Sequence, residues 1–492
     1  MKLNEFAKNS LILSVSNFGL LLLGFLYRIV INGFTGAEGL GVYRLLFSIY
    51  IVANTFCISG FSMAIATIGA GEFSKCGSTA NLLRRCIALF LLFYAGASVF
   101  VLCNCDHLSR FISGDITAIP AIRIMLLCLF LTGFENMLKS VFVAVGKVYF
   151  TAISEVSEQI VRILAVYILM KLFADGGYGK TAFLIMAAMV ISELVSVAFL
   201  LFAYHKTFEA AEGCGTVSYK RILKIALPVS ATALINNSVE SANTVILPSR
   251  LQVFGLTSDR AMGQIGVISG IVLPVLTLPT AVISSVSSNL VPKINRESRT
   301  RLCHTAEKVF EVSGLIGIPA TCVLLPLGQP IARVFFSQNI PEKIFVLLAA
   351  AVIMMYYDMI ITGILNGVER QKSIMVNSIV SSVLQLAVTF VFVPKMGIYG
   401  YIYAVLGGTF LNLLMNMYSV KTQISIRFSK IVLPSVLCGA AIYLWVRFFY
   451  SLIFSAAGRQ TTGLIFSIAA AALVYVFIIR ALKKKGIILK DG

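Results

Sequence analysis

Residues 10–32 read SLILSVSNFGLLLLGFLYRIVIN, an apolar run that contains one charged residue, Arg28. About 20 apolar residues are enough for one helical crossing of a bilayer core. No small-residue cleavage site follows the run, so it predicts an uncleaved first transmembrane helix rather than a signal peptide. This stretch places the chain in a membrane from its first helix.

Similar runs recur along the whole chain. Of its 492 residues, 58% are hydrophobic and 12% are charged, and its mean hydropathy is +0.92. Soluble domains carry roughly 25% charged residues. Polar breaks predict an all-α, polytopic protein of about 14 crossings. The expected helices cover about 10–32, 43–70, 85–104, 119–143, 150–172, 181–204, 222–247, 263–290, 309–330, 343–366, 373–393, 399–420, 430–452 and 462–482.

The formal net charge of +19 follows the expected topology rather than a nucleic-acid surface. With a cytoplasmic N-terminus, roughly 25 of the 40 Lys and Arg residues fall on cytoplasmic ends and loops. The main carriers are Arg84–Arg85, the run from Lys293 to Arg301, and Lys483–Lys485. We therefore expect both termini to be cytoplasmic, no nucleic-acid partner, and some attraction to anionic lipid headgroups.

The chain repeats one design after roughly 220 residues, and internal repeats are common in transporters. Residues 137–154 (MLKSVFVAVGKVYFTAIS) and 359–377 (MIITGILNGVERQKSIMVN) each end a helix at a glycine, cross a short basic turn and begin another helix. Two six-helix lobes would then be related by an axis along the membrane normal. The expected division is a first lobe at 1–204, a cytoplasmic linker at 205–221, a second lobe at 222–420, and two C-terminal helices with a basic tail at 421–492.

Four arginines are candidates for binding an anionic substrate: Arg28, Arg44, Arg162 and Arg250. A charge at a helix centre costs about 2.5–3.5 kcal/mol on insertion scales, so it is retained where it faces water, a partner or a ligand. Arg28 has no acid within helical reach in its own helix, and either contacts substrate or a counter-ion, or anchors at the outer interface. Arg44 lies nearer the headgroups, where snorkelling is an alternative.

Other intramembrane polar residues are candidates for cavity charge or coupling: Glu158, Gln159, Glu240 and Asp358. Glu158 and Arg162 are four residues apart and can also form a self-neutralised pair that only holds helices together. No Cys or His spacing suggests a metal site, and no cofactor is expected beyond a possible coupling ion, Na⁺ or H⁺, or the membrane potential.

Three prolines within expected helices are candidate hinges: Pro228, Pro274 and Pro279. Each removes a backbone donor and favours a kink. A static bend and a flexing hinge are both compatible with this pattern.

Four segments, in order along nearly the whole chain, carry a recognisable pattern. The first, LLGFLYRIVINGFTGAEGLGVYRLLF (22–47), contains Gly-Phe-x-x-Arg and Gly-x-x-Gly-x-Gly-x-Tyr. SEVSEQIVRI (154–163) contains Glu-Gln-x-x-Arg, and the other two segments are 247–280 and GILNGVERQK (363–372). Together they resemble the stage V sporulation protein B group of polysaccharide flippases, which belongs with the MurJ-type lipid II flippases and the multidrug extruders in one exporter superfamily.

The resemblance implies a fold of two pseudo-symmetric six-helix lobes around a central cavity with two extra C-terminal helices, and alternating access between the two sides of the membrane. It implies that a polyprenyl-(pyro)phosphate-linked saccharide, a lipid II-like or polysaccharide precursor, moves to the outer leaflet and that cavity arginines of the first lobe serve its pyrophosphate. Arg28 stands one position after the arginine of helix 1 in MurJ-type proteins, whose place is taken by Tyr27. We expect a monomer in a bacterial plasma membrane, with membrane lipids and the lipid-linked saccharide as its partners.

Two other functions compete with a flippase role in polysaccharide, peptidoglycan or spore biogenesis. A multidrug or cation antiporter of the same superfamily usually needs an intramembrane acid, and the first helix offers only Arg28. A membrane polymerase or ligase would need more extramembrane surface than the short outer loops provide, so we do not expect an enzyme.

The expected topology predicts the labelling of single cysteines placed at Thr216 and Ser258 in a cysteine-free background. Thr216 lies in the cytoplasmic linker and Ser258 on the outer side, so an impermeant thiol reagent added to intact cells should label only the cysteine at 258. Equal labelling of both positions would contradict the helix count.

Overall fold

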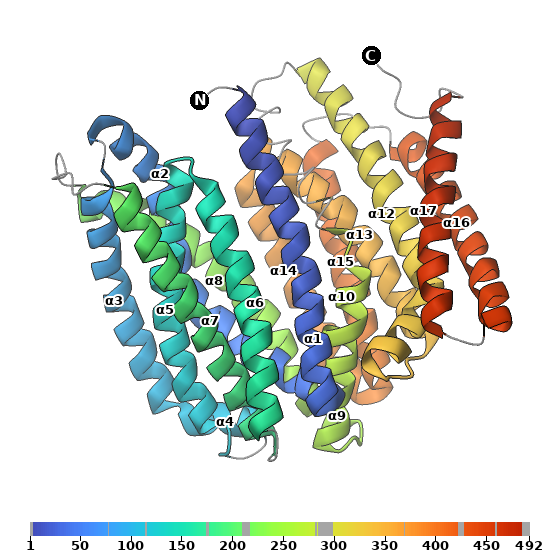
Figure 1. Ribbon diagram of the computed structural model, residues 1–492, viewed down its shortest axis with the longest axis horizontal. Helices are drawn as coiled ribbons and strands as arrows, with labels where there is room; N and C mark the ends of the chain where they lie inside the picture. The colour runs from blue at the N-terminus through green and yellow to red at the C-terminus, as the bar shows by residue number, and fades with distance from the viewer. Residues whose placement is uncertain are drawn as a thin grey trace. The chain divides into compact units, whose positions relative to one another are not determined.

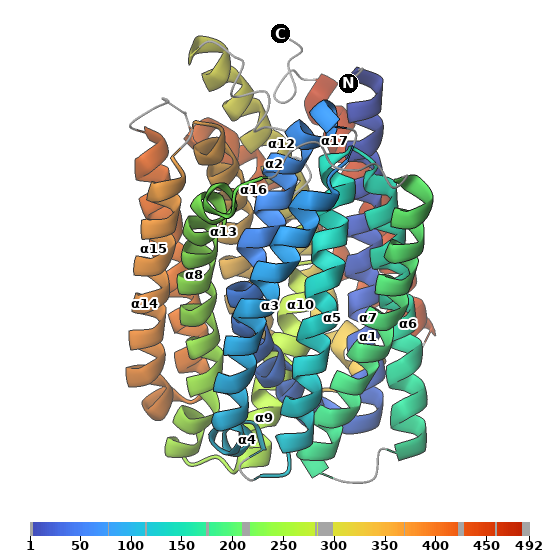
Figure 2. The same cartoon turned by 90° about the vertical axis from the view of Figure 1, so that its left-hand side faces the viewer.

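The computed structural model describes two compact helical units, Met1–Gly266 and Val267–Gly492. Within them, the residues described are 3–76, 78–113, 116–173, 177–208, 217–280, 283, 299–368, 370–421, 428–457 and 460–484. The described part of the chain contains helices and no strand (Figures 1 and 2). An all-α architecture is the one that satisfies every backbone donor and acceptor within each apolar segment.

The first unit is built from long helices joined by short turns. Its helices are α1 (Leu3–Asn54), the π-helical segment η1 (Thr55–Ser59), α2 (Gly60–Cys76), α3 (Ala80–Cys103), α4 (Cys105–Ser113), α5 (Ile119–Ala144), α6 (Val148–Phe173), α7 (Gly177–Thr207), α8 (Tyr219–Val253) and α9 (Ser258–Ile265). In this unit α5 packs against α7, α6 against α7 and α1, and α8 against α1, η1 and α2.

A backbone break at Gly36 divides α1 into two crossings. Gly36 has φ 67° and ψ −168°, a conformation open essentially to glycine alone. The second crossing continues from Ala37 through η1 and α2 to Cys76. The sequence expectation of two helices at 10–32 and 43–70 is confirmed, and the observed helices run longer because the polar stretch between them is itself helical except at Gly36.

The π-helical segment η1 is where α8 docks on the second crossing. The Asn237 Nδ2 donates to Thr55 Oγ1 at 2.7 Å, and the Gly60 backbone N–H donates to Ser230 Oγ at 3.1 Å. Gly60 permits this approach because a Cβ there would lie 2.3 Å from the Ala226 carbonyl oxygen. Pro228 lies between Ala226 and Ser230 inside a continuous α8. Its hinge role stays a prediction.

The second unit has the same long-helix construction. After η2 (Gly266–Val272), its described helices are α10 (Leu273–Leu276), α12 (Arg299–Phe336), α13 (Glu342–Gly367), α14 (Gln371–Met396), α15 (Ile398–Lys421), α16 (Phe428–Ala457) and α17 (Gln460–Lys484). In this unit α15 packs against α13 and α14, and α12 and α17 both pack against α16. The buried Tyr356 joins three elements, because its hydroxyl donates to the Leu276 carbonyl at 2.8 Å and accepts from Thr321 at 3.2 Å.

The single helix expected at 263–290 is wrong in its described part. The segment is divided into the end of α9, the π-helical η2, α10, and a turn at 277–279. Pro274 begins α10 and Pro279 ends the turn, and neither can donate a backbone hydrogen bond. Residues 281–282 and 284–290 lie outside the described residues, and flexing at the two prolines stays a prediction.

The helices provide the expected number of crossings. Eleven described helical stretches are long and apolar enough to span a bilayer, and the first of them, Val15–Ser74, has 60 residues and contains two crossings. Charged residues keep α6 out of that set, although it is as long as its neighbours, and α17 is a further helix of 25 residues. Counting these gives fourteen crossings in the described part of the chain, which confirms the polytopic fold class.

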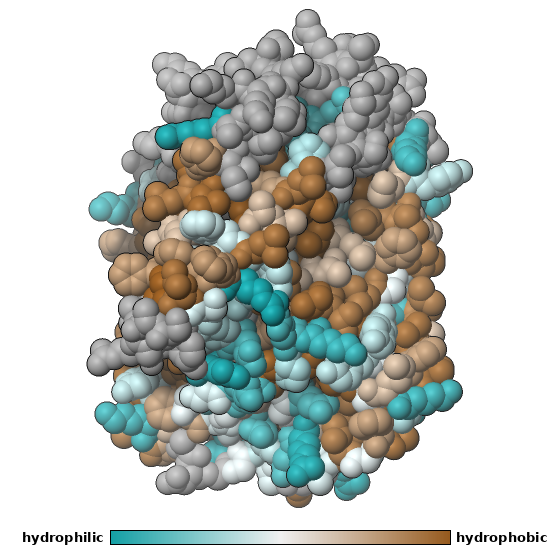
Figure 3. All heavy atoms as spheres, turned by 90° about the vertical axis from the view of Figure 1, so that its right-hand side faces the viewer, coloured by the Kyte–Doolittle hydropathy of each residue, from teal (hydrophilic) through white to brown (hydrophobic). Residues whose placement is uncertain are grey.

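Figure 3 shows one face of the molecule. Between the grey residues and the centre of this face hydrophobic side chains predominate, and hydrophilic side chains extend from the centre to the lower end. Apolar side chains facing outward at mid-height are expected where lipid is the solvent.

The contacts place α8 and α9 with the first unit, which extends to Gly266 and therefore past the linker expected at 205–221. Residues 209–216 of that linker lie outside the described residues. The division into lobes at 1–204 and 222–420 stays a prediction.

Gly41 provides a test of the tight packing between α1 and α9. A Cβ on Gly41 would lie 2.3 Å from the Met262 carbonyl oxygen, whereas Gly33 has no atom within 4 Å of that position. Gly41→Ala should therefore destabilise the protein by about 1–3 kcal/mol, while Gly33→Ala should be neutral or stabilising by up to about 1 kcal/mol. Thermal unfolding of both variants in one detergent measures the difference. Equal melting temperatures would contradict the packing described.

Candidate functional site

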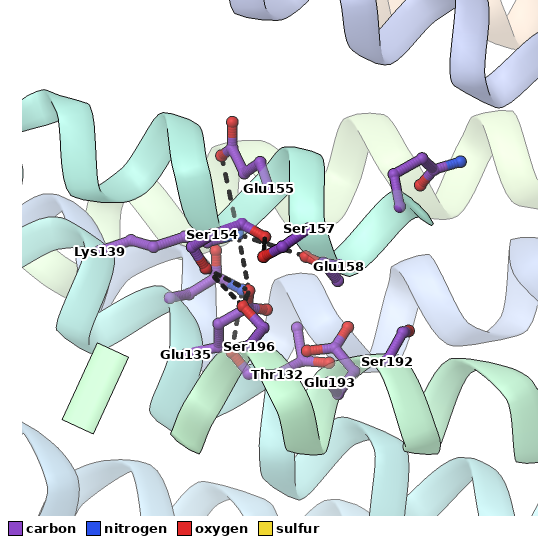
Figure 4. Close-up of polar contacts among 12 residues, drawn as sticks. Thr132, Glu135, Lys139, Ser154, Glu155, Ser157, Glu158, Ser192, Glu193 and Ser196 are labelled. Carbon is purple, nitrogen blue, oxygen red and sulfur yellow. Dashed lines mark hydrogen bonds and ion pairs between the residues drawn. The ribbon is translucent and has the colours of Figure 1, made fainter. Parts of the chain in front are cut away.

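Three helices of the first unit, α5, α6 and α7, meet at a buried group of charged side chains (Figure 4). Members from the same helix lie three or four residues apart, so they share one helical face. The α5–α6 turn at 145–147 is short and holds these two faces side by side. This charged cluster consists of Glu135 and Lys139 from α5, Glu155, Glu158 and Arg162 from α6, and Glu193 from α7.

Lys139 is the cation at one end of the charged cluster. Its ammonium lies 2.8 Å from Glu135, 3.5 Å from Glu158 and 3.7 Å from Glu155. Only 14% of its side chain is exposed. Lys139 thus binds carboxylates from two helices at once.

Arg162 is the cation at the other end, and its guanidinium is fully engaged within the protein. It binds the Glu158 carboxylate through Nη2, which also lies 3.4 Å from Glu193. Its Nε donates to Ser192 at 3.1 Å and its Nη1 to Gln159 at 3.3 Å. The predicted residues Glu158, Gln159 and Arg162 are therefore together, with their polar groups directed at one another and at α7.

The charged cluster carries two cations against four carboxylates. Glu135 and Glu193 are only 2% and 3% exposed, so their charges depend on these partners. Hydroxyl groups add to the compensation, because both Ser154 and Ser196 donate to Glu135. Carboxylate oxygens of Glu135, Glu158 and Glu193 lie within 4.8 Å of one another, a donor set of the type that hard cations prefer. Lys139 and Arg162 supply the positive charge at these oxygens.

Arg28 has a different environment from Arg162. The side chain is half-buried on α1 and donates from Nη1 to the Gly24 carbonyl at 3.3 Å. Its Nε is buried without a hydrogen-bond partner, and no acidic side chain among the described residues pairs with it. Its neighbour Tyr27 is 3% exposed and packs edge-on against Tyr43, with ring centroids 5.7 Å apart. Tyr27, at the position of the MurJ-type arginine, is thus in the core, and Arg28 has no compensating acid within the part of the chain that the structure describes.

The two other candidate arginines lie on helices that contact each other. Arg44, from the second half of α1, lies 3.4 Å from Glu240 of α8, with side-chain exposures of 31% and 69%. Arg250 is half-buried near the C-terminal end of α8. Arg44 and Glu240 therefore form a partly solvated pair, which contributes at most about 1 kcal/mol.

Asp358 lies in the second unit, on α13, among neutral hydrogen-bond donors from α15. Its two carboxylate oxygens accept from Asn412 at 2.9 Å and from Asn416 at 2.8 Å. Asn416 in turn accepts from Asn377 of α14 at 2.8 Å. Amide donors satisfy this carboxylate, and no cationic side chain in the described part of the chain pairs with it.

Sequence reasoning did not assign roles to several members of these groups. Glu193 is less exposed than Glu158, the other acid that contacts Arg162. It lies in an apolar helix with Ser192 and Ser196, and this group of polar residues was the only sequence feature that indicated a polar contact there. Asn412 and Asn416 are four residues apart and therefore share a face of α15. Such spacing indicates a polar face but does not identify the residue on another helix that it meets.

Comparison with known proteins gives a family match over more than half of the chain. Residues 6–297 match the family model described as "Polysaccharide biosynthesis protein", and residues 244–391 match that named "MatE". "Stage V sporulation protein B" of Bacillus subtilis (strain 168) is 24% identical over 98% of this chain and 97% of its own length. "Sporulation protein YkvU" of the same organism is 21% identical over 79% of this chain and 88% of its own length. The resemblance found in the sequence motifs is confirmed.

Solved structures share the fold. "Lipid II flippase MurJ, inward closed conformation" aligns with a TM-score of 0.73 and 16% identity over 96% of this chain and 99% of that chain. "Inward-facing conformation of a multidrug resistance MATE family transporter of the MOP superfamily" aligns with a TM-score of 0.66 and 17% identity over 83% of this chain and 98% of that chain. At this identity the likeness establishes architecture, which confirms the expected fold class.

Lys139→Met tests whether the charged cluster stabilises the first unit. Methionine keeps the approximate volume but leaves four carboxylates with one cation, so unfolding free energy should fall by about 3–5 kcal/mol. Arg221→Met breaks a more exposed pair, in which Arg221 lies 3.5 Å from Glu72, and should change stability by less than about 1 kcal/mol. The melting temperatures of the two variants, each compared with that of the wild type, measure this difference.

A second variant separates lost charge balance from lost packing. Adding Glu135→Gln to Lys139→Met removes one uncompensated carboxylate and should restore part of the lost stability in a double-mutant cycle. Additive losses would show that Lys139 stabilises the unit through its alkyl chain alone.

Proposed function

This chain belongs to the polysaccharide biosynthesis protein family, and from that membership we propose that it is a flippase for a lipid-linked saccharide. It moves a polyprenyl-(pyro)phosphate-linked saccharide, a lipid II-like or polysaccharide precursor, from the inner to the outer leaflet by alternating access. It acts as a monomer in the plasma membrane of a bacterium, with both termini in the cytoplasm. Its sporulation relatives in Bacillus subtilis fit a role in building a cell envelope layer.

The observation that carries the proposal is the uncompensated charge of Arg28. An ionised side chain within a membrane-spanning helix costs about 2.5–3.5 kcal/mol on insertion scales. Arg162 offsets that cost through its contacts to Glu158, Glu193, Ser192 and Gln159. Arg28 has only a backbone carbonyl among the described residues. The described residues thus leave Arg28 without an anionic partner, and in this proposal the substrate supplies the negative charge.

A phosphate diester or pyrophosphate fits Arg28 better than other anions of the membrane interior. The planar guanidinium presents paired N–H donors that match two phosphate oxygens. The substrate class proposed here carries its phosphate between an apolar chain and a polar saccharide. Arg28 can thus bind the part of the substrate that is common to all lipid-linked saccharides, whatever sugars follow it.

The other predicted arginines take supporting roles in this proposal. Arg44 is held by Glu240 in a partly exposed pair that an anionic headgroup can open at small cost. Arg250 lies on the same helix as Glu240 and adds positive charge near the end of α8. Arg162 is a predicted substrate-binding residue because it belongs to the Glu-Gln-x-x-Arg motif. In this conformation its guanidinium already donates to Ser192 and Glu158, so it positions α6 against α7.

We assign energy coupling to four polar residues of the spanning helices other than the arginines. Glu158 belongs to the charged cluster, in which carboxylates outnumber cations, and Gln159 accepts a hydrogen bond from Arg162 of that cluster. Glu240 and Asp358 are further carboxylates within spanning helices. We include these four residues in the proposal as sites where Na⁺, H⁺ or the membrane potential acts on the conformational change.

The charged cluster also favours a second candidate, a multidrug or cation antiporter. Excess carboxylates inside a helical unit are the feature that a cation or proton exchanger needs. The two functions differ in the ligand they predict for Arg28, because a cationic drug would be repelled by it.

Replacement of Arg28 tests the flippase proposal. In proteoliposomes, Arg28→Ala should reduce translocation of a polyprenyl-pyrophosphate saccharide by more than about tenfold, because one charge-assisted bidentate contact is worth about 1.5–3 kcal/mol. Arg28→Lys should retain part of the rate, since a point charge keeps the attraction and loses the paired geometry. Melting temperatures of both variants should match the wild type.

Arg123→Ala is the matched control, because Arg123 is an exposed arginine on another spanning helix, α5. Its translocation rate should be unchanged. A loss of stability in Arg28→Ala that is repaired together with activity by removing an acid elsewhere would show a structural arginine. Ethidium efflux by the wild type without translocation of lipid-linked saccharide would support the antiporter instead.

A further inference from the structure

The first unit contains a cavity of about 930 Å³ that is separate from Arg28 and from the charged cluster. It lies between the middle of the second crossing (residues 48–56), α3 and α8, and Leu108 of α4 also lines it. Figure 2 shows α3 and α8 on the viewer's side, with α4 at the lower end of α3. Neither Arg44 nor Glu240 is among the lining residues, so the pair between α1 and α8 lies outside the cavity.

The cavity wall offers hydrocarbon and almost no free polar group. Its side chains are mainly those of valine, leucine, isoleucine, phenylalanine and alanine. Ser48 already donates to the Arg44 carbonyl at 2.8 Å, and Ser241 to the Ser48 carbonyl at 3.0 Å. A sugar, an ion or ordered water needs several polar partners, which this wall does not supply.

The cavity is lined in part by exposed apolar side chains, so it opens at the surface of the first unit. Leu92 and Phe100, which line it from α3, are each 68% exposed. Gly96, between them on the same face, has no atom within 4 Å of the position of a Cβ. α3 and α8 are both long and apolar enough to span a bilayer, and only 22% and 11%, respectively, of their apolar 18-residue segments is buried within the protein. The cavity is therefore continuous with the interface between protein and bilayer.

The cavity has the length of one leaflet. Its lining residues on α8 run from Leu234 to Val245, about 16 Å at 1.5 Å per residue. Half of a hydrocarbon core roughly 30 Å thick is about 15 Å. The cavity reaches α4, a short helix that carries Asp106 and Arg110 and suits the headgroup level. A chain that enters from that level would end near mid-membrane.

We propose that this cavity binds one acyl chain of a membrane phospholipid from the leaflet on the α4 side. The chain fills the space between α3 and α8 and supports α8 where it docks on η1. Its volume is at the upper end of ligand pockets, roughly 300–1,000 Å³, and an empty space of that size would leave the lining without contacts. The site goes beyond the proposed function, because it holds a lipid that is not transported.

Photocrosslinking in nanodiscs tests this site with a defined probe, phosphatidylglycerol that carries a diazirine on its acyl chain. Wild-type protein should crosslink at lining residues of α3 and α8, mapped by peptide mass spectrometry. Gly96→Leu places a branched side chain in the cavity and should lower crosslinking at Val245 about tenfold. Leucine has a higher helix propensity than glycine, so the variant should remain folded.

Gly407→Leu is the matched control, because Gly407 is an exposed glycine of α15 with no atom within 4 Å of a Cβ. It should leave the crosslinking pattern unchanged. Absence of lining-residue crosslinks in the wild type, or equal crosslinking in Gly96→Leu and wild type, would overturn the proposal. A diazirine-bearing polyprenyl phosphate that labels the cavity in preference to phosphatidylglycerol would assign it to the substrate's chain and also overturn it.

Discussion

The contacts of Lys139 and Arg162 with four glutamates determine how the first unit can pack. Hydrocarbon offers no partner to an ionised group, so these charges are stable only where α5, α6 and α7 bring them together. The arrangement fixes the register of the three helices, because a shift by one residue would move each charge off the shared face. The unit thus holds a charged cluster within a core whose other buried side chains are mainly apolar.

The same constraint distinguishes the arginines that have acidic partners among the described residues from the arginine that has none there. Arg162 and Arg28 are both arginines of spanning helices, yet one is surrounded by acceptors and the other has a single backbone carbonyl. Arg44 lies between these extremes, paired with the partly exposed Glu240. A transporter that binds its substrate transiently needs a charge whose partner can leave, and a structural charge needs partners that stay. This contrast is the basis for proposing a substrate contact for Arg28 and a structural role for Arg162.

Much of the fold could be predicted from the sequence, because apolar length alone decides how often a chain crosses a bilayer. The fourteen crossings followed from that length, and the Glu158–Arg162 pair followed from helical spacing. The break of 263–276 into α, π and α segments did not, since periodicity does not report where a π-helical turn forms. The role of Glu193 was also missed, because its acid partners and its arginine come from other helices. Contacts between helices distant in sequence depend on packing that a local pattern does not encode.

The central claim is that Arg28 binds the phosphate of a lipid-linked substrate. Binding in nanodiscs can compare a polyprenyl-pyrophosphate saccharide with the same saccharide linked to the prenyl chain without phosphate. The account predicts that wild-type protein binds the phosphorylated lipid at least about tenfold more tightly, and that Arg28→Ala abolishes this preference while retaining affinity for the neutral lipid. Equal affinities of the wild type for the two lipids would contradict the account.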